Sequence, residues 1–148
     1  MRTYQVLDTP LRLAHFMAQT AHESGGFQYM EEVGSTSYFA RYDGRKDLGN
    51  TFPGDGPLFH GRGPIQLTGR LNYRTYGQAL GLDFESNPTM VAMPAVGMLV
   101  ASKFWSDKGL NTLADADDVL AITKRINGGT TGLDDRKARL VKAKELIL

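Results

Sequence analysis

A run of turn-forming residues between positions 34 and 64 constrains the fold more than any other feature of this chain. Glycine, proline, aspartate and asparagine recur there in the clusters YDGR (42–45), LGN (48–50) and PGDGP (53–57), and these residue types favour turns. Irregular segments of this length in compact domains are either functional or disordered. Aromatic residues within the segment predict an ordered loop: Tyr38, Phe39, Tyr42, Phe52 and Phe59.

The segments on either side of this loop carry helical signals. Thr9-Pro10 is typical of a helix start, because threonine can cap free amides and proline fits the first helical position. Apolar residues then recur at a spacing of three to four as far as Ser24, and Gly25-Gly26 predicts the end of the helix. Four further helices are predicted at residues 69–80, 94–106, 115 or 117 to 126, and 133–147.

Together these signals predict a mainly helical single domain that covers residues 1–148, with at most a small β-hairpin within residues 59–68. A chain of 148 residues suits one domain and can bury roughly two-thirds of its unfolded surface. It contains no cysteine, so it has neither disulfides nor thiolate metal ligands and the core alone must stabilise the fold. We expect no cofactor and no metal.

Charge and hydropathy restrict the partners of the protein. The net charge of +1 argues against a dedicated nucleic-acid-binding protein. The longest apolar stretch, residues 96–101, is too short to cross a bilayer, and residues 1–11 lack the apolar region of a signal peptide. The basic residues of the last helix are typical of a solvated face. We therefore expect a monomer that is made in the cytoplasm without a signal peptide and has no stable membrane insertion.

Glu23 is the candidate general acid of a glycoside hydrolase. Hydrolysis of a glycosidic bond requires an acid that protonates the leaving oxygen and a second carboxylate that acts as base or nucleophile. Glu23 ends an apolar helical run beside two glycines, where an apolar setting would suit an acid and a ligand could approach the backbone closely. Glu31 and Glu32 are the candidates for the second carboxylate, and their positions do not distinguish them. Read singly, each glutamate is more often a surface charge.

The segment GRGPIQLT (61–68) supplies candidate sugar-binding groups. Gln66 and Thr68 alternate with two apolar residues, which is typical of a strand with one face toward a groove. Asn72 and Tyr73 add neutral donors and acceptors of the kind that sugars require. Asn127, before two glycines, is typical of a helix end and could also present its amide to a ligand.

A zinc site is the main alternative of another class. His15, His22 and His60 could serve a wall amidase or peptidase together with a carboxylate. The HExxH pattern of many zinc peptidases is absent, because Gly26 stands where its second histidine would be. Insensitivity to EDTA would exclude this alternative.

Several motifs in order resemble glycoside hydrolase family 19. They are AHESGGF (21–27), YDGRKDLGNTFPGDGPLFHGRGPIQLTGRLNY (42–73) and INGG (126–129), so the resemblance covers nearly the whole chain from about residue 11. Within the family the chain looks most like compact bacterial and phage members known as chitinases or endolysins. The resemblance implies a lysozyme-like, mostly helical fold with a substrate cleft between two lobes, and an inverting acid–base mechanism without metal.

The resemblance also implies roles for individual residues. Glu23 matches the general acid and Glu32 the general base, with Glu31 as the alternative base. Thr68 matches a hydroxyl that helps to hold the attacking water. Five further residues match substrate-binding positions: Gln66, Asn72, Tyr73, Asn127 and Arg136. Of these, Arg136 could instead be a partner of the acidic residues. Many relatives have an additional helix before the catalytic helix, whereas about nine residues precede it here.

These expectations lead to one main hypothesis for function. The chain would cleave β-1,4 bonds in a polymer that contains N-acetylglucosamine. We expect peptidoglycan as the substrate and a phage or prophage lysis enzyme that reaches the cell wall after holin-dependent release. The alternatives are a chitinase acting on chitin, the zinc amidase or peptidase, and an inactive glycan-binding module, against which the paired acidic residues argue.

Overall fold

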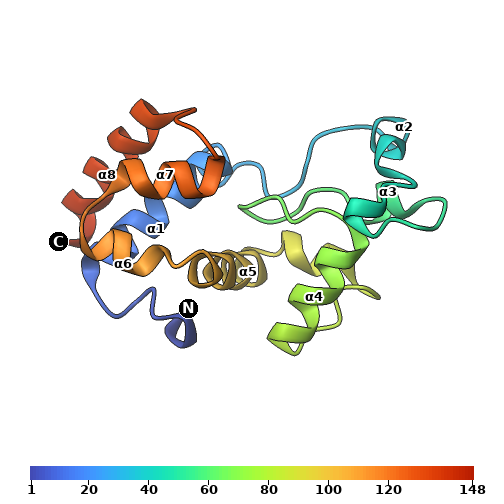
Figure 1. The fold of residues 1–148 in the computed structure, drawn as a ribbon, viewed down its shortest axis with the longest axis horizontal. Coiled ribbons are helices and arrows are strands. Elements are labelled where there is room, and N and C mark those ends of the chain that lie inside the picture. Colours follow the sequence, from blue (N-terminus) through green and yellow to red (C-terminus); the bar gives the residue numbers. More distant parts are fainter. The chain divides into compact units, whose positions relative to one another are not determined.

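The computed structural model describes residues 1–148 and is mainly helical (Figure 1). Its elements are the 3-10 helices η1 (Arg2–Tyr4), η2 (Ala40–Tyr42), η3 (Lys46–Leu48) and η4 (Pro88–Ala92), and the α-helices α1 (Pro10–Glu23), α2 (Thr36–Phe39), α3 (Asp55–Leu58), α4 (Arg70–Leu80), α5 (Pro94–Asp107), α6 (Leu110–Asp115), α7 (Val119–Asn127) and α8 (Leu133–Ile147). The chain divides into two compact units, residues 1–27 with 101–148, and residues 28–100. The predicted mainly helical class is confirmed.

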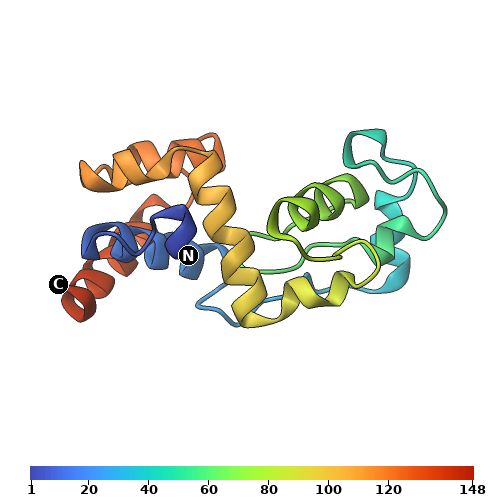
Figure 2. The ribbon, with the colours of Figure 1, turned by 90° about the horizontal axis from the view of Figure 1, so that it is seen from below.

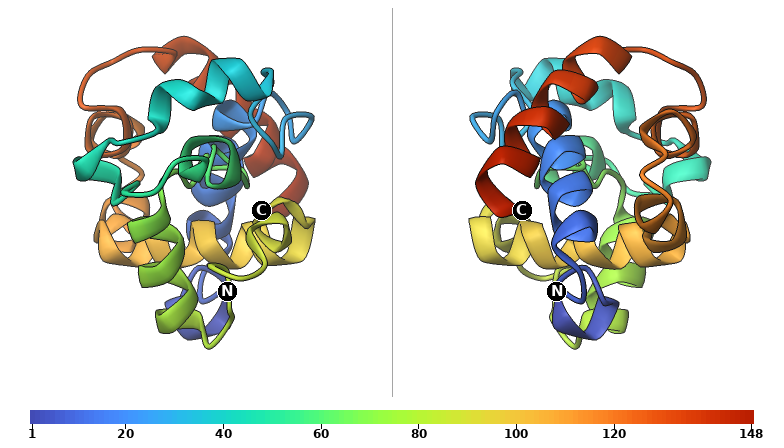
Figure 3. Two further views of the ribbon diagram at one scale, coloured as in Figure 1. Left: turned by 90° about the vertical axis from the view of Figure 1, so that its right-hand side faces the viewer. Right: turned by 90° about the vertical axis from the view of Figure 1, so that its left-hand side faces the viewer.

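In the first unit, α1 packs along α8, as Figures 1 and 3 show with the blue and red helices side by side. Their contact is built on small residues and one leucine: Ala14, Ala18, Leu140 and Ala143 are buried there. Small side chains allow two helices to approach closely, so the register of α1 against α8 is well defined. This register matters because α1 ends at Glu23.

The start of α1 follows the sequence prediction. The Thr9 hydroxyl accepts a hydrogen bond from the Arg12 amide at 3.1 Å, and Pro10 occupies the first turn. A cap of this kind stabilises a helix by about 1 kcal/mol. The side of α1 that faces inward places Phe16 edge-on against Trp105 of α5, with ring centroids 5.5 Å apart.

The start of α7 differs from the prediction. The expected cap was Asp115 or Asp117, but Asp118 caps the helix by accepting the Ala121 amide at 2.8 Å. Asp115 instead ends α6 and pairs with Arg12 at 2.6 Å. Asp117 has a φ of 55° and binds Lys144 at 2.6 Å, so neither residue is free to cap. The sequence prediction also missed α6.

The second unit has its own apolar core. Six residues of the hairpin segment, α4, the segment that follows α4, η4 and α5 are buried together: Phe59, Leu67, Tyr73, Phe84, Val91 and Val100. The segment after α4 turns back along the helix, as Figure 2 shows, and packs against Gly77. A Cβ at Gly77 would lie 2.5 Å from the Leu82 carbonyl oxygen, so this close approach requires glycine.

The long irregular segment is ordered, as its aromatic residues predicted. It contains the short helices α2, η2, η3 and α3. The Asp43 carboxylate holds its later turn, because it accepts the amides of Gly54 at 3.2 Å and Gly56 at 2.6 Å. Asn50 is fully buried and links this segment to the start of α4 by accepting the Arg70 amide at 2.8 Å.

The expected hairpin is reduced to two isolated antiparallel bridges, Glu31 with Arg62 and Arg62 with Leu67. The strand-like reading of residues 65–68 is wrong at Gln66, whose φ of 54° places it in the left-handed region of a turn. The backbone amide of Gln66 donates to the Gly63 carbonyl at 3.0 Å and closes that turn. No helix is long and apolar enough to cross a membrane.

Candidate active site

Glu23 lies at the end of α1 and is bound by a buried arginine. Nη2 of Arg136 donates to Glu23 Oε1 at 2.6 Å, and Nη1 donates to Gln19 Oε1 at 2.5 Å. Nε of the same guanidinium donates to the Thr131 carbonyl at 3.3 Å. We call Gln19, Glu23 and Arg136 the Glu23 cluster. Arg136 is 1% exposed, whereas the Glu23 side chain is 31% exposed.

This arrangement changes the expected surroundings of Glu23. An apolar wall was predicted beside the carboxylate, but the structure places a guanidinium there. A buried cation requires a charged or well-bonded partner, so Arg136 and Glu23 depend on each other. Gln19 is buried, and its Nε2 has no hydrogen-bond partner in the structure. The cluster therefore presents one partly exposed carboxylate at the surface of the first unit, held from behind.

Arg136 was expected either to bind substrate or to partner an acidic residue. The structure shows contact with Glu23. Because the Arg136 side chain is almost fully buried, its contacts favour holding the carboxylate over touching a sugar. Asn127, at the end of α7, is exposed and is followed by Gly128 in a left-handed conformation, as a helix end requires.

Glu31 and Glu32 bind different partners although they are adjacent in the chain. Glu31 Oε1 accepts from Nε2 of His60 at 2.8 Å and from Nε of the buried Arg62 at 2.9 Å. Burial acts to raise the pKa of Glu31, but the hydrogen bonds from His60 and Arg62 outweigh it and lower the pKa. Glu31 is thus engaged in holding the hairpin segment together, although its side chain is 49% exposed.

Glu32 is held by two other donors. Its Oε1 accepts the Tyr42 hydroxyl at 2.9 Å, and its Oε2 accepts the Gly61 amide at 3.1 Å. Nη2 of Arg41 lies 3.6 Å from Oε1. The Glu32 side chain is 20% exposed, so this fixed carboxylate remains reachable from solvent.

Three polar groups converge above Gly61. A Cβ built on Gly61 would lie 2.8 Å from Gln66 Oε1, 3.2 Å from Glu32 Oε2 and 3.3 Å from Thr68 Oγ1. The three atoms therefore converge beside the Cα of Gly61, where only a glycine leaves room for them. We call Glu32, Gly61, Gln66 and Thr68 the Glu32 cluster. A small polar molecule such as water would find several partners there.

The side chains of this cluster are themselves positioned by the backbone. Thr68 donates its hydroxyl to the Gln66 carbonyl at 2.9 Å, which leaves its oxygen free to accept a hydrogen bond. Gln66 Nε2 donates to the Gly63 carbonyl at 2.9 Å. A non-glycine residue with positive φ, as at Gln66, is uncommon and is often found at functional sites.

Asn72 and Tyr73, both expected to bind substrate, have different surroundings. Asn72 lies in the first turn of α4 and donates to the Thr68 carbonyl at 2.8 Å. Tyr73 is 0% exposed in the core of the second unit, and burial raises its pKa to about 12. Its hydroxyl donates to the His60 carbonyl at 2.7 Å. As placed, Tyr73 supports the hairpin segment and does not reach a substrate, which corrects the prediction.

The three histidines each bind a separate carboxylate. His15 pairs with Asp117 at 2.7 Å, His22 with Asp135 at 2.6 Å and His60 with Glu31 at 2.8 Å. No group of three or more metal-ligating side chains forms. His60 also stacks on Phe39 with ring centroids 4.1 Å apart. These contacts favour structural roles for the histidines.

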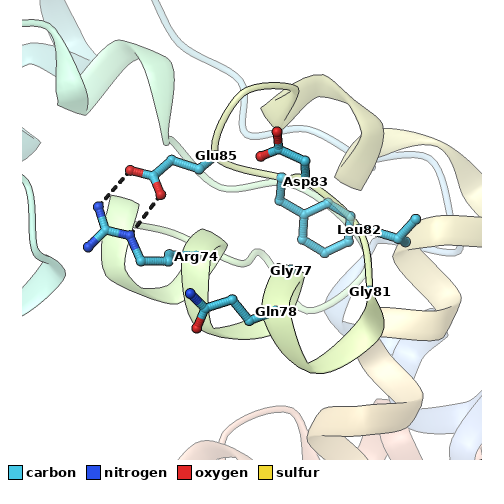
Figure 4. Close-up of a pocket in the computed structure, with 8 residues that line it drawn as sticks. Arg74, Gly77, Gln78, Gly81, Leu82, Asp83 and Glu85 are labelled. Carbon is cyan, nitrogen blue, oxygen red and sulfur yellow. Dashed lines mark hydrogen bonds and ion pairs between the residues drawn. The ribbon is translucent and has the colours of Figure 1, made fainter.

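A surface hollow of about 380 Å³ in the second unit involves none of the candidate residues. It is lined by residues of α4 and the returning segment, shown in Figure 4: Arg74, Gly77, Gln78, Gly81, Leu82, Asp83, Phe84 and Glu85. Its charged groups already pair, since Arg74 binds Glu85 at 2.6 Å. It has no carboxylate poised like Glu23 or Glu32.

Two cluster residues, Gln19 and Gly61, and one partner of Glu32, Tyr42, were not identified as functional from the sequence. Gln19 precedes Glu23 by four residues, so helical spacing alone places both on one face of α1. Tyr42 and Gly61 lie within the quoted motifs, but their contacts with Glu32 join segments 10 and 29 residues apart in the chain. Spacing does not reveal such contacts.

The comparisons with known proteins bear on this site. A sequence model of the family described as class I chitinases, glycoside hydrolase family 19, matches residues 8–125. An endochitinase of Arabidopsis thaliana is 38% identical over 119 residues, which cover 79% of this chain and 39% of the relative. A protein of Haemophilus influenzae that contains a glycosyl hydrolase family 19 domain is 32% identical over 154 residues, covering 85% of this chain and 75% of the relative.

A crystal structure of a chitinase C mutant shares the fold, with a TM-score of 0.78 at 24% identity. The match covers 93% of this chain and 60% of the chitinase C chain. The chain spans about two fifths of the length of the plant relatives that it matches. The family match includes Glu23 and the whole Glu32 cluster and ends before Asn127 and Arg136.

Proposed function

Because the chain belongs to glycoside hydrolase family 19, we propose that residues 1–148 form one catalytic domain that hydrolyses β-1,4 glycosidic bonds in an N-acetylglucosamine-containing polymer. Glu23 acts as the general acid and protonates the glycosidic oxygen. Glu32 acts as the general base and removes a proton from a water molecule, which attacks the anomeric carbon from the opposite face. A single displacement of this kind inverts the configuration at the anomeric carbon and requires no covalent glycosyl–enzyme intermediate.

The convergence of the Glu32 cluster carries this proposal. A water molecule near Gly61 would find the carboxylate of Glu32, the amide oxygen of Gln66 and the hydroxyl of Thr68 within reach. All three groups can accept a hydrogen bond, so a water molecule can donate its two hydrogen bonds to two of them and direct a lone pair outward. Orientation of this kind supplies a large part of an enzymatic rate enhancement.

The Glu23 cluster fixes the position of the proposed acid. Arg136, itself bound by Gln19, holds one carboxylate oxygen of Glu23 from the buried side, so the second oxygen is left for a ligand. We propose that Arg136 positions Glu23, while Asn127, Asn72 and Gln66 bind sugar groups. General acid–base assistance by a positioned pair contributes on the order of 10²–10⁴-fold in rate.

We further propose peptidoglycan as the polymer and a phage or prophage lysis enzyme as the biological role. A chain without cysteine suits synthesis in a reducing compartment before holin-dependent release. Chitin is the alternative, and the plant relatives are named endochitinases. The two substrates share the β-1,4 linkage, so the acid and base roles are the same for both.

Two assays separate the substrates. We expect purified wild-type protein to clear suspensions of outer-membrane-permeabilised Gram-negative cells and to release muropeptides with new reducing ends, identified by mass spectrometry. Release of oligomers from colloidal chitin, without clearing of the cells, would instead assign a chitinase. Co-expression with and without a holin tests the route to the wall, because lysis only with the holin supports the proposed release.

A zinc-dependent amidase or peptidase would behave differently in the same assays. It would lose activity in EDTA and release peptides without new reducing sugars. The separate pairing of His15, His22 and His60 argues against this reading. We expect full activity in EDTA.

A further inference from the structure

We propose that Tyr42 is the positioning residue for the general base, and that its hydroxyl sets the orientation of the Glu32 carboxylate. This inference rests on the proposed function, because it concerns Glu32 as the general base. Tyr42 lies at the end of η2 in the long irregular segment, within the second unit.

The first argument is the geometry of the carboxylate. The Tyr42 hydroxyl binds Oε1 at 2.9 Å and the Gly61 amide binds Oε2 at 3.1 Å. One donor on each oxygen fixes the plane of the carboxylate, which a single donor would leave free to rotate. The Gly61 donor belongs to the backbone, and Nη2 of Arg41 lies farther from Oε1, at 3.6 Å. Tyr42 is therefore the side chain whose hydrogen bond orients Glu32.

The second argument is the direction of the hydrogen bonds. Nη2 of Arg41 donates to the Tyr42 hydroxyl oxygen at 3.0 Å, because a guanidinium has no acceptor. The Tyr42 proton is therefore directed to Glu32. Arg41 Cζ itself lies 3.7 Å from the centroid of the Tyr38 ring. A chain of donors thus ends on Oε1 of Glu32 and holds this oxygen in one position.

The third argument is that Tyr42 is itself anchored. The Tyr42 carbonyl accepts a hydrogen bond from Nδ2 of Asn50 at 2.9 Å. Oδ1 of Asn50 in turn accepts a hydrogen bond at 2.8 Å from the backbone amide of Arg70, at the start of α4. Asn50 is fully buried. Tyr42 is thus tied to a helix terminus rather than carried on a free loop. This explains why the YDGR and LGN clusters occur together: the first supplies the tyrosine and the second its anchor.

The test is Tyr42→Phe, which keeps the ring and removes the hydroxyl. Tyr38→Phe is the matched control, because the Tyr38 hydroxyl makes no hydrogen bond and its ring can still support Arg41. We expect kcat of Tyr42→Phe to fall at least 10-fold with KM within 2-fold of wild type, as for a group that acts in the transition state. Tyr38→Phe should match wild type in both kcat and KM.

Several outcomes would overturn the inference. They are an unchanged kcat, a change in KM as large as the change in kcat, or an equal loss of kcat in Tyr38→Phe. If Tyr42→Phe loses activity only in proportion to a loss of folded protein, measured by circular dichroism and urea unfolding, Tyr42 is structural and the inference fails. If the wild type cleaves no glycan, the proposed function fails instead. If the wild type is active and the Tyr42 variant equals it, the inference fails while the proposed function stands.

Discussion

Glu31 and Glu32 are neighbours in the chain, yet Glu31 binds the buried Arg62 at 2.9 Å while Glu32 binds the Tyr42 hydroxyl at 2.9 Å. Successive side chains of an extended segment point to opposite sides, so Glu31 faces His60 and Arg62 while Glu32 faces Tyr42. This difference gives the two carboxylates separable roles, one in stability and one in the proposed chemistry.

The first prediction separates these roles. Glu32→Gln should lower kcat by on the order of 10²–10⁴-fold and leave the urea midpoint of unfolding close to wild type. Glu31→Gln should retain most activity at low temperature and lower the free energy of unfolding by about 1–2 kcal/mol, because Arg62 loses its ionised partner. Equal loss of activity in the two variants, with equal stability, would contradict the division.

The second prediction concerns Gly61. An added methyl would lie 2.8 Å from Gln66 Oε1 and 3.2 Å from Glu32 Oε2. Gly61→Ala should therefore displace both side chains and lower kcat about 100-fold, the cost of a misplacement near 1 Å. Because the displaced atoms are the ends of side chains, the thermal midpoint should change little. Wild-type activity in this variant would show that the open space above Gly61 has no catalytic use.

The third prediction concerns the guanidinium behind Glu23. Arg136→Lys keeps the charge but cannot donate to both Gln19 and Glu23 in the fork geometry seen here. We expect a lower kcat and a loss of about 2–4 kcal/mol in unfolding free energy. Arg139→Lys on the same helix, where the guanidinium pairs with the half-exposed Asp135, should cost less than about 1 kcal/mol and keep activity. Comparable losses in the two variants would contradict a special role for Arg136.

The fourth prediction is a pH dependence of stability. Hydrogen bonds from Arg74 and Arg70 lower the pKa of Glu85 from 4.5 to about 2. A carboxylate with a lowered pKa stabilises the folded state above its ordinary pKa, and this contribution is lost as the pH falls from about 4.5 toward 2. Urea midpoints measured from pH 6 to pH 3 should therefore fall more steeply for wild type than for Glu85→Gln. Parallel curves would contradict the pairing.

Much of the helical fold follows from local signals. The Thr9 cap and the two glycines after α1 bound that helix to within a residue, and the long last helix begins where its acidic first turn predicts. The start of α7 was misplaced because three aspartates lie close together and only tertiary partners decide among them. Lys144 and Arg12 bind two of them from elsewhere in the chain.

The candidate site was predicted less completely. The sequence order of Glu23, Glu32, Gln66 and Thr68 points to them through the family resemblance. Their contacts do not follow from that order, because Arg136 reaches Glu23 across 113 residues and Tyr42 reaches Glu32 through a bend in the irregular segment. Tyr73 shows the opposite failure, since a polar residue within a binding motif points into the core.

We propose that Glu23 and Glu32 hydrolyse the glycan strand of peptidoglycan. Digestion of purified sacculi in water enriched in ¹⁸O, with the muropeptides read by mass spectrometry, tests it most directly. We predict one ¹⁸O at each new reducing sugar for the wild type, and none of these products above background for Glu23→Gln or Glu32→Gln, with both variants folded. Label found only in peptide carboxyls, or wild-type yields from either variant, would contradict the account.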